Sequence, residues 1–336
     1  MDLLNALVVL ANFVIIPGIA YGSTLALGAL GITLIYGILR FSNFAHGDTM
    51  AFGGMFAVLG TWWLQSKGIS IAPLPTALLV IPFAIVLMIL FLLFCDRTIY
   101  RYYRKVKASP IILVMASLGI TFIMNGLVRF IIGPGERRFA DGTRFLISAR
   151  DFKAMTGLNE GLAIRLSQVI TFVAAIIIVA ALFWFLNKTR TGKSMRAFSD
   201  NEDLALLSGI NPEKVVTIVW VLVAILATVS GTLYGLDKTY KPFTYFMLLL
   251  PMFAAAIVGG LGNPVGAIAG GFVIAFSEIF VTYAFKKFFG YILPKDMLPS
   301  GIIQIISTDY KFAVSFTILV LVLLFRPTGI FKGQSI

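Results

Sequence analysis

The chain of 336 residues is poor in the side chains that metal sites and nucleophilic active sites use. It has one cysteine, Cys95, and one histidine, His46, and only 12% of its residues are charged, which is roughly half the share in a globular protein. One cysteine allows no internal disulfide, and one histidine with one cysteine argues against a metal site and against a membrane enzyme. The sequence also lacks a GxxxxGK[ST] phosphate-binding loop, so a function that needs ATP would require another chain.

Long apolar stretches make up most of the chain. Hydrophobic residues account for 59% of it, and a helix needs about 20 such residues to cross a bilayer. The stretches are continuous rather than alternating, which disfavours a membrane β-barrel. The sequence therefore predicts an all-α polytopic membrane protein with a single transmembrane domain over residues 1–336. We expect about eight to ten transmembrane helices, because the first span could break at Pro17-Gly18. The nine spans expected without that break are 13–38, 44–65, 74–95, 109–132, 162–186, 215–236, 244–261, 264–286 and 311–326.

Positive charge is in excess, with a formal net charge of +12, but it lies in short loops between the apolar spans. This placement is typical of membrane topology and of contact with anionic lipid, not of nucleic-acid binding. Loops 96–107 and 187–214 share a side because two spans separate them. The five Lys/Arg residues of 96–107 predict that this side is cytoplasmic. The N-terminus is then outside and the C-terminus inside, although loop 133–161 on the outer side also has five Lys/Arg residues.

The stretch FSNFAHGD, residues 41–48, places Asn43, His46 and Asp48 between two apolar spans, with glycines around them. One interpretation is a turn at the cytoplasmic surface, with Asp48 stabilised near the N-terminus of the next helix by the helix dipole. The other is a helix interrupted inside the membrane, whose three polar side chains line a cavity on a transport path. If His46 and Asp48 form a pair, removal of one would leave the other buried and unpaired.

The run AAAIVGGLGNPVGAIAGGFVIAFSE, residues 254–278, is rich in glycine where a single span would otherwise continue. Gly262, Gly266 and Gly270 are four residues apart and would share one helix face. Small residues in such a stripe let two helix backbones approach closely. The run therefore predicts at least a close packing surface between helices.

An interrupted helix near 259–266 is the alternative for the same run. Pro264 lies in its middle, and the interruption would place Gly262 and Asn263 beside the transport path. Glu278 is the only acid in its span. It either forms a salt bridge at the outer end of its helix or faces the same path.

A polar insert at 189–215, TRTGKSMRAFSDNEDLALLSGINPEKV, contains helix signals of its own. Ser199 or Asp200 would cap a short helix over Asn201–Leu207, and Gly209 would end it. Such a helix, lying parallel to the membrane, fits the groove of a partner protein; the alternative is a solvated loop. The residues expected to carry the contact are Arg196, Ser199, Asp200, Glu202, Ala205 and Gly209, with Leu206 as a further apolar contact.

Four stretches together resemble a known family. They are TLIYGILRFSNFAHGD at 33–48, RTGKSMRAFSDNEDLALLSGIN at 190–211, AAIVGGLGNPVGAIAGG at 255–271 and FRPTGIF at 325–331. The chain resembles the membrane-embedded permease subunit of bacterial branched-chain amino acid ABC transporters, and it looks most like the first of their two paired permeases. The four stretches follow the family's order over nearly the whole chain.

The resemblance implies an ATP-driven importer of the bacterial inner membrane, in which this chain forms the path for branched-chain or related hydrophobic amino acids. It implies that the chain is not an enzyme, holds no cofactor, and works with a second permease subunit as a heterodimer. It also implies two cytoplasmic ATPases, which bind ATP and magnesium, and a periplasmic substrate-binding protein. The segment 190–211 falls where the family has its ATPase coupling segment, within the loop at 187–214. Its acids, Asp200, Glu202 and Asp203, depart from the family's usual pattern.

Three other functions remain open from the sequence. The family is similar to permeases that import amides and urea. An ion-driven secondary transporter would carry several paired carboxylates in its spans, whereas this chain offers mainly Asp48 and Glu278. A channel would show a repeated filter motif or a ring-forming polar stripe, and the sequence has neither.

Overall fold

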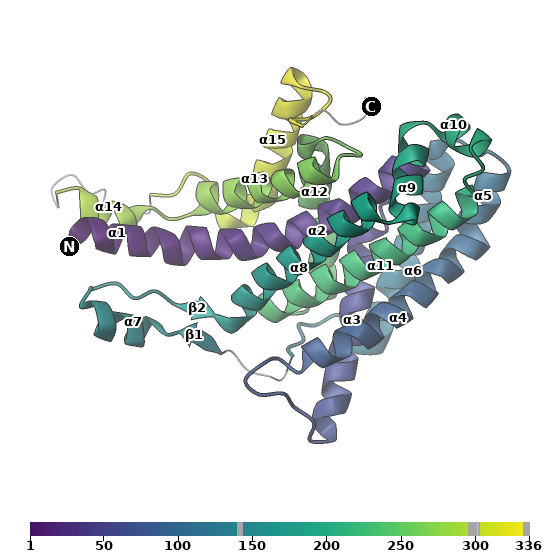
Figure 1. Cartoon of the computed structure of the whole chain (residues 1–336). Coiled ribbons are helices and arrows are strands. Elements are labelled where there is room, and N and C mark those ends of the chain that lie inside the picture. The colour runs from purple at the N-terminus through teal and green to yellow at the C-terminus, as the bar shows by residue number, and fades with distance from the viewer. Residues whose placement is uncertain (140–143, 295–300, 302, 332–336) are drawn as a thin grey trace.

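A computed structural model describes residues 1–139, 144–294, 301 and 303–331 of the chain, and these residues are mostly helical (Figure 1). In chain order the elements are α1 (Asp2–Leu10), the π-helical turn η1 (Ala11–Ile15), α2 (Ile16–Leu39), α3 (His46–Ser66), α4 (Ala77–Cys95), the π-helical turn η2 (Asp96–Tyr100), α5 (Arg101–Lys105), α6 (Pro110–Ile132), β1 (Phe145–Ile147), α7 (Ala149–Thr156), β2 (Ile164–Arg165), α8 (Leu166–Lys188), α9 (Arg190–Asp200), α10 (Glu202–Leu207), α11 (Pro212–Asp237), α12 (Pro242–Gly259), α13 (Pro264–Thr282), α14 (Lys286–Ile292), the 3-10 turn η4 (Thr308–Tyr310) and α15 (Lys311–Phe325).

All nine predicted spans correspond to helices. Eight helical stretches are long and apolar enough to cross a membrane, and the ninth span, 44–65, is the 21-residue helix α3, whose first turn holds His46 and Asp48. The first span is one helical stretch of 38 residues, Asp2–Leu39, because the π-helical turn η1 leads directly into α2 and no break occurs at Pro17. The chain is therefore an all-α polytopic membrane protein.

The two helices α2 and α11 form the centre of the bundle. Both are buried along most of their length, α2 from Gly18 to Ile38 and α11 from Val215 to Asp237. α13 lies alongside α2 (Figure 1). The two backbones approach closely because glycine faces a large side chain: a Cβ added at Gly22 would lie 2.6 Å from the ring of Phe272 on α13.

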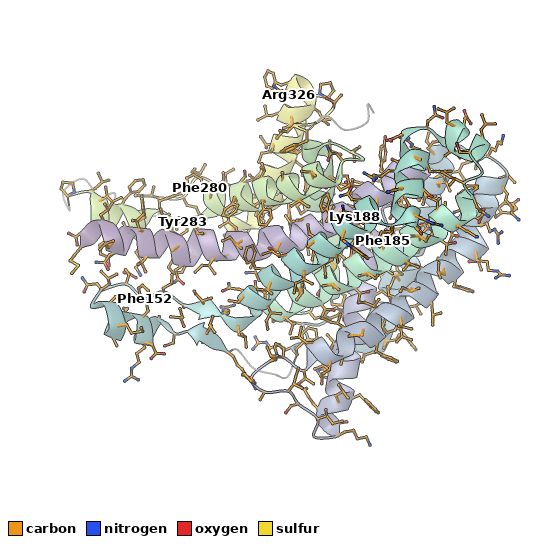
Figure 2. The ribbon with its side chains drawn as sticks, in the orientation of Figure 1. Phe152, Phe185, Lys188, Phe280, Tyr283 and Arg326 are labelled. Carbon is orange, nitrogen blue, oxygen red and sulfur yellow. The ribbon has the colours of Figure 1, made fainter. Side chains whose placement is uncertain are left out.

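Apolar side chains cover the outside of the bundle (Figure 2). On α6, Phe122 is 72% exposed and Phe130 is 88% exposed. Aromatic side chains exposed to this extent in large numbers mark a surface that contacts lipid. The interior of the protein is thus held together by close packing, while lipid surrounds its outer faces.

Figure 1 shows α5, α9 and α10 at one end of the molecule and α1, α7 and α14 at the opposite end. The α9–α10 end, which also holds α5, is tied together by ion pairs between Arg104 and Asp96 (2.5 Å) and between Arg101 and Glu213 (3.2 Å). The α7–α14 end holds the N-terminus and is tied by the ion pair between Lys287 and Glu160 (2.7 Å). Loops 96–107 and 187–214 therefore share an end, as the span count predicts.

Several short elements were not predicted from the sequence. Within 133–165 the strands β1 and β2 pair antiparallel, and α7 lies between them. Ser148 caps α7 by accepting a hydrogen bond from the Asp151 N–H, and Gly157 ends it with a φ of 69°. The insert at 189–215 also contains more helix than expected, because α9 occupies Arg190–Asp200 ahead of the short predicted helix.

Candidate functional site

The first predicted interruption lies between α2 and α3. Arg40 adopts a φ of 54°, and its N–H donates to the carbonyl of Tyr36, which ends α2. Asn43 then orders the turn: its Oδ1 accepts hydrogen bonds from the Ala45 N–H (3.1 Å) and from the Tyr100 hydroxyl (3.4 Å). Asn43 is 2% exposed, so this turn is part of the protein interior and not a solvated surface loop.

His46 is the first residue of α3 and is completely buried. Its ring lies against α2 at Gly31, where a Cβ would be 2.8 Å from Nε2. Among the described residues neither ring nitrogen has a hydrogen-bond partner. An unsatisfied buried polar group costs about 1–3 kcal/mol, so this histidine is kept at a cost in stability.

Asp48 lies about half a turn further along α3 and is 1% exposed. Its Oδ1 accepts a hydrogen bond from the Asn125 side chain on α6 (2.8 Å), while Oδ2 has no partner among the described residues. The pair of His46 with Asp48 that the sequence analysis considered is not formed. Residues two apart on a helix point to different faces, so His46 faces α2 and Asp48 faces α6.

The glycines around these residues bring α3 into close contact with its neighbours. A Cβ at Gly47 would lie 2.6 Å from the Tyr245 carbonyl oxygen on α12, and one at Gly53 would lie 2.5 Å from the Thr228 hydroxyl on α11. The first two turns of α3 are therefore enclosed by α2, α6, α11 and α12. This explains why three polar side chains can be held at fixed positions in an apolar bundle.

The second predicted interruption lies between α12 and α13. Gly260 and Gly262 have φ values of 112° and 82°, which end α12 and turn the chain. Asn263 caps α13, because its Oδ1 accepts from the N–H groups of Val265 (3.0 Å) and Gly266 (3.1 Å). Its Nδ2 donates to the Phe331 carbonyl (2.9 Å), so the FRPTGIF stretch packs on this turn.

The glycine stripe is shorter than predicted. Gly262 precedes α13, which begins at Pro264, and is not on its face. Gly266 and Gly270 do share that face. Gly266 lies against the backbone of Gly259, and Gly270 against the Ala255 carbonyl. The stripe therefore packs α13 on α12 within the same chain.

Glu278 lies near the far end of α13 and is 1% exposed. Its Oε2 accepts a hydrogen bond from the Tyr21 hydroxyl of α2 (3.0 Å), and its Oε1 accepts one from the Ser315 hydroxyl of α15. No salt bridge to Glu278 occurs in the part of the chain that the structure describes, so these residues do not support the alternative of a helix-end salt bridge. Glu278 instead joins three helices through hydroxyl groups.

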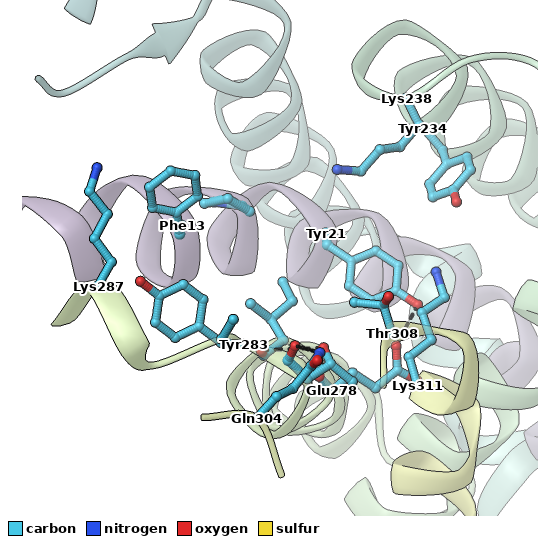
Figure 3. Close-up of a pocket in the computed structure, with 14 residues that line it drawn as sticks. Phe13, Tyr21, Tyr234, Lys238, Glu278, Tyr283, Lys287, Gln304, Thr308 and Lys311 are labelled. Carbon is cyan, nitrogen blue, oxygen red and sulfur yellow. Dashed lines mark hydrogen bonds between the residues drawn. The ribbon is translucent and has the colours of Figure 1, made fainter. Parts of the chain in front are cut away.

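A cavity of about 610 Å³ lies at this position, at the α7–α14 end. Figure 3 shows Phe13 and Tyr283 on one side of it, Tyr21 and Lys311 on the other, and Glu278 between them. Lys238, from the end of α11, also lines it. We call it the outer cavity.

The predicted short helix of the 189–215 insert is α10. Its cap is Asn201 and neither of the expected residues, Ser199 and Asp200; the Asn201 Oδ1 accepts from the Leu204 N–H (3.0 Å). Gly209 ends it as predicted, with a φ of 78°. Ala205 is buried, whereas Leu204, Leu206 and Leu207 are 61%, 43% and 85% exposed. Arg196, Asp200 and Glu202 are also exposed.

The α9 helix is attached to the end of α2. The Ser199 hydroxyl donates to the Gly37 carbonyl (3.0 Å), and the Arg40 guanidinium donates to the Ser199 carbonyl (2.5 Å). A cavity of about 230 Å³ beside this contact is lined by Arg196, Ser199 and Asp200 and also by Gly262. Ser199 is therefore half-buried against α2.

The structure thus divides the predicted site residues into two groups. At the α9–α10 end, the 190–211 segment, the turn at Gly262 and the α2–α3 turn lie around the end of α2. Glu278 lies 14 residues along α13 from Pro264, or about 21 Å away at 1.5 Å per residue. Asn43, His46 and Asp48 line neither the outer cavity nor the cavity beside Ser199.

Four residues of this arrangement were missed. Asn125 had a signal, since it is an amide within an apolar span. Tyr21 and Ser315, the partners of Glu278, had none, because hydroxyl side chains are common in spans and their contacts join segments far apart in sequence. The role of Arg40 depends on a left-handed backbone that the sequence does not indicate.

Comparison with known proteins gives a consistent result. Residues 14–323 match the family described as branched-chain amino acid transport system, permease component. The chain is 28% identical to the high-affinity branched-chain amino acid transport system permease protein BraD of Pseudomonas aeruginosa, over 94% of each chain. It is 29% identical to LivH of Escherichia coli, a permease protein of the same description, over 93% of this chain and 92% of LivH. It is 30% identical to a probable branched-chain amino acid transport permease, LivH, of Methanocaldococcus jannaschii, over 93% of this chain and 90% of that one. No solved structure matches significantly.

Proposed function

Because this chain belongs to the family of permease components of branched-chain amino acid transport systems, we propose that it forms part of the membrane path of an ATP-driven importer for branched-chain amino acids. It is a multi-pass protein of the inner membrane, with eight helical stretches suited to crossing it. The family match over residues 14–323 supports the proposal, since only the first 13 and the last 13 residues of the chain lie outside it. BraD and LivH are named for branched-chain amino acids, which favours this substrate class over amides and urea.

ATP and magnesium are bound by partner ATPases in this proposal, since the sequence has no phosphate-binding loop. The remaining partners are a substrate-binding protein on the outer side and a second, related permease. The resemblance to the first of two paired permeases supports a heterodimer. Co-expression with each candidate second permease, followed by mass measurement of the purified complex, tests this. A stable homodimer alone would contradict it.

The segment α9–α10 is proposed to dock on the ATPase. Three leucines of α10 are exposed at the end of the molecule that the basic loop 96–107 marks as cytoplasmic. A short helix with an exposed apolar face fits a groove on a partner. The hydrogen bonds from Ser199 to Gly37 and from Arg40 to Ser199 then connect the docking segment with the end of α2 and the turn before His46.

Asn43, His46, Asp48, Gly262 and Asn263 are proposed to act at the cytoplasmic end of the path. The support is their position: both interrupted regions adjoin the segment that would receive the movement of the ATPase. The unsatisfied atoms of His46 and Asp48 are compatible with a second arrangement of these helices, in which the atoms find partners.

Reconstitution of the complete importer tests the function. Vesicles containing the two permeases and the ATPases are loaded with ATP, and leucine-loaded binding protein is supplied outside. Leucine uptake is expected with ATP and magnesium, and not with a non-hydrolysable analogue. Uptake that persists without ATP and stops when ionophores remove ion gradients would favour an ion-driven transporter instead.

Cysteine crosslinking tests the docking segment. Leu207→Cys should crosslink to the ATPase, because the side chain is 85% exposed, whereas Ala205→Cys, only two residues away and 2% exposed, should not. Both variants are made in a Cys95→Ser background. Labelling of Leu207→Cys only from the outer side would contradict both the docking and the topology.

A further inference from the structure

The outer cavity is lined by one carboxylate, Glu278, by three lysines and by an apolar wall. Two of the lysines have acidic partners: Lys238 lies 3.5 Å from Asp237 and Lys287 lies 2.7 Å from Glu160. Lys311 is the third. Phe13 and Tyr283 stack at 6.2 Å between ring centroids, and Tyr21 lies 6.5 Å from Tyr234. These four rings come from η1, α2, α11 and the residue after α13, so the fold brings distant segments together around one space (Figure 3). Its volume of about 610 Å³ falls within the range of about 300–1,000 Å³ typical of sites for small molecules.

The charged groups of the cavity are held apart from one another. Glu278 is fixed by the Tyr21 and Ser315 hydroxyls. Two hydrogen bonds leave a carboxylate with about two free acceptor positions. The Lys311 ammonium lies 5.8 Å from the Tyr21 ring centroid and 4.8 Å from that of Phe312, and in the described chain no carboxylate lies within salt-bridge distance of it. A positive and a negative group are therefore close but not neutralised by direct contact.

This arrangement matches an amino acid with an aliphatic side chain. A zwitterion carries an ammonium and a carboxylate on one carbon, so it needs an acceptor and a cation near each other, while its side chain needs an apolar surface. Lipid tails would leave both charges unsolvated, and amides or urea would not require either charge.

Resting on the function proposed above, we propose that the outer cavity holds the transported amino acid as a zwitterion. Glu278 accepts hydrogen bonds from its ammonium group, Lys311 donates to its carboxylate, and the rings of Phe13, Tyr234 and Tyr283 contact its aliphatic side chain. Next to Tyr21, α2 and α13 are in direct contact, because Gly22 packs on Phe272. The cavity lies at the α7–α14 end, so in this proposal it is an outward-facing site, filled after the binding protein releases its load.

Protection of an introduced cysteine tests the site directly. Thr308 lines the cavity and is exposed, so Thr308→Cys in a Cys95→Ser background should react with a charged, membrane-impermeant thiol reagent. The complete importer is placed in nanodiscs without binding protein. The probes are L-leucine, 4-methylpentanoate, which lacks the ammonium, and isoamylamine, which lacks the carboxylate.

Leucine should slow the labelling, and each single-charge analogue should need at least about tenfold higher concentration, as expected for the loss of a charge-assisted hydrogen bond. Glu278→Gln should weaken the protection by leucine about tenfold but leave the protection by 4-methylpentanoate unchanged. Lys311→Gln should weaken the protection by leucine but leave the protection by isoamylamine unchanged. Lys241→Gln is the matched control, because Lys241 is an exposed lysine at the same end that does not line the cavity.

No protection by leucine, or equal protection by all three probes, would overturn the proposal. So would an equal effect of Lys241→Gln. The same preparations are assayed for ATP-dependent leucine uptake with binding protein present. If uptake is normal but leucine does not protect the cysteine, the outer site is refuted and the proposed function is not. If there is no uptake, the proposed function is refuted. Thermal unfolding of each variant separates misfolding from lost binding. If Glu278→Gln does not fold, the comparison of Lys311→Gln with Lys241→Gln still tests the proposal.

Discussion

The contact between α12 and α13 offers a direct test of the packing, through Gly266→Ala. A Cβ at Gly266 would overlap the Gly259 carbonyl oxygen, lie 2.8 Å from its carbonyl carbon and lie 3.3 Å from Cβ of Phe331. The first obstacle is backbone, which cannot rotate away as a side chain can. The two helices would have to separate by roughly 1 Å to reach ordinary contact.

Gly126→Ala is the matched control. Gly126 lies in the interior of α6 and is exposed, and a Cβ added there would have no heavy atom within 4 Å among its described surroundings. Gly126→Ala gains the helix preference of alanine over glycine, about 0.5–1 kcal/mol, and Gly266→Ala gains no more than this, because Gly266 lies in the first turn of α13. Only Gly266→Ala adds an overpacking cost of about 1–3 kcal/mol. The two variants should therefore differ by about 1–3 kcal/mol, with Gly126→Ala the more stable and at or above the parent.

The measurement is unfolding of the purified permease in detergent, followed by circular dichroism and intrinsic tryptophan fluorescence. Assembly with the ATPases should be intact in both variants at low temperature, since the change is confined to one chain. If Gly266→Ala is as stable as Gly126→Ala, then α12 and α13 are not in backbone contact. If Gly266→Ala keeps its stability but loses the second permease, the stripe is a subunit interface and not an internal one.

Three further changes test other parts of the structure. His46→Ala and Asp48→Asn should change the free energy of unfolding additively, within about 0.5 kcal/mol, because the side chains face different helices. A larger coupling energy would indicate that His46 and Asp48 interact directly. Ser199→Ala removes the hydrogen bond to Gly37, and leucine uptake should fall severalfold while ATP hydrolysis continues; unchanged uptake would count against this link. Burial raises the pKa of Glu160, but the hydrogen bonds from Lys287 and Tyr291 outweigh it, so the net pKa is lowered from 4.5. Its contribution to stability is present at neutral pH and is lost as pH falls below 4.5 and through the folded pKa, so the stability of Glu160→Gln should vary less with pH in this acid range than that of the parent.

The spans could be predicted because apolar length alone decides whether a helix crosses a bilayer. The span at 44–65 was recognised despite His46 and Asp48, since the apolar residues after them still fill a crossing. The break between α12 and α13 was also predictable, because Gly260 and Gly262 permit the positive φ values that end a helix, and Pro264 favours the first turn of the next one. Each of these signals lies within a short stretch of sequence.

Contacts between distant segments could not be read in the same way. The sequence placed Asp48 beside His46, but the helix turns them to different neighbours, and the partner of Asp48 is 77 residues away. Glu278 is bonded to Tyr21, 257 residues away. Such pairings depend on which helices are adjacent and on their rotation, and hydropathy contains neither. The family resemblance identified the coupling segment but not its attachment to α2.

The helix α2 links the two functional regions because it takes part in both. Near its start, Tyr21 donates to Glu278 in the wall of the outer cavity; near its end, Gly37 accepts from Ser199 of α9. The 16 residues between them span about 24 Å of one uninterrupted helix. A helix buried on nearly all sides moves as a rigid body, since its neighbours leave no room for bending. A displacement of α9 by the ATPase would therefore shift Tyr21 as well, and with it the position of the Glu278 carboxylate and the shape of the outer cavity. Gly22 and Gly31 bring the neighbours of α2 into direct contact with its backbone, because Phe272 and His46 pack where a Cβ would otherwise lie. On this argument, loss of the Ser199–Gly37 bond and loss of the Tyr21–Glu278 bond should disturb the same step, the passage of substrate out of the outer cavity.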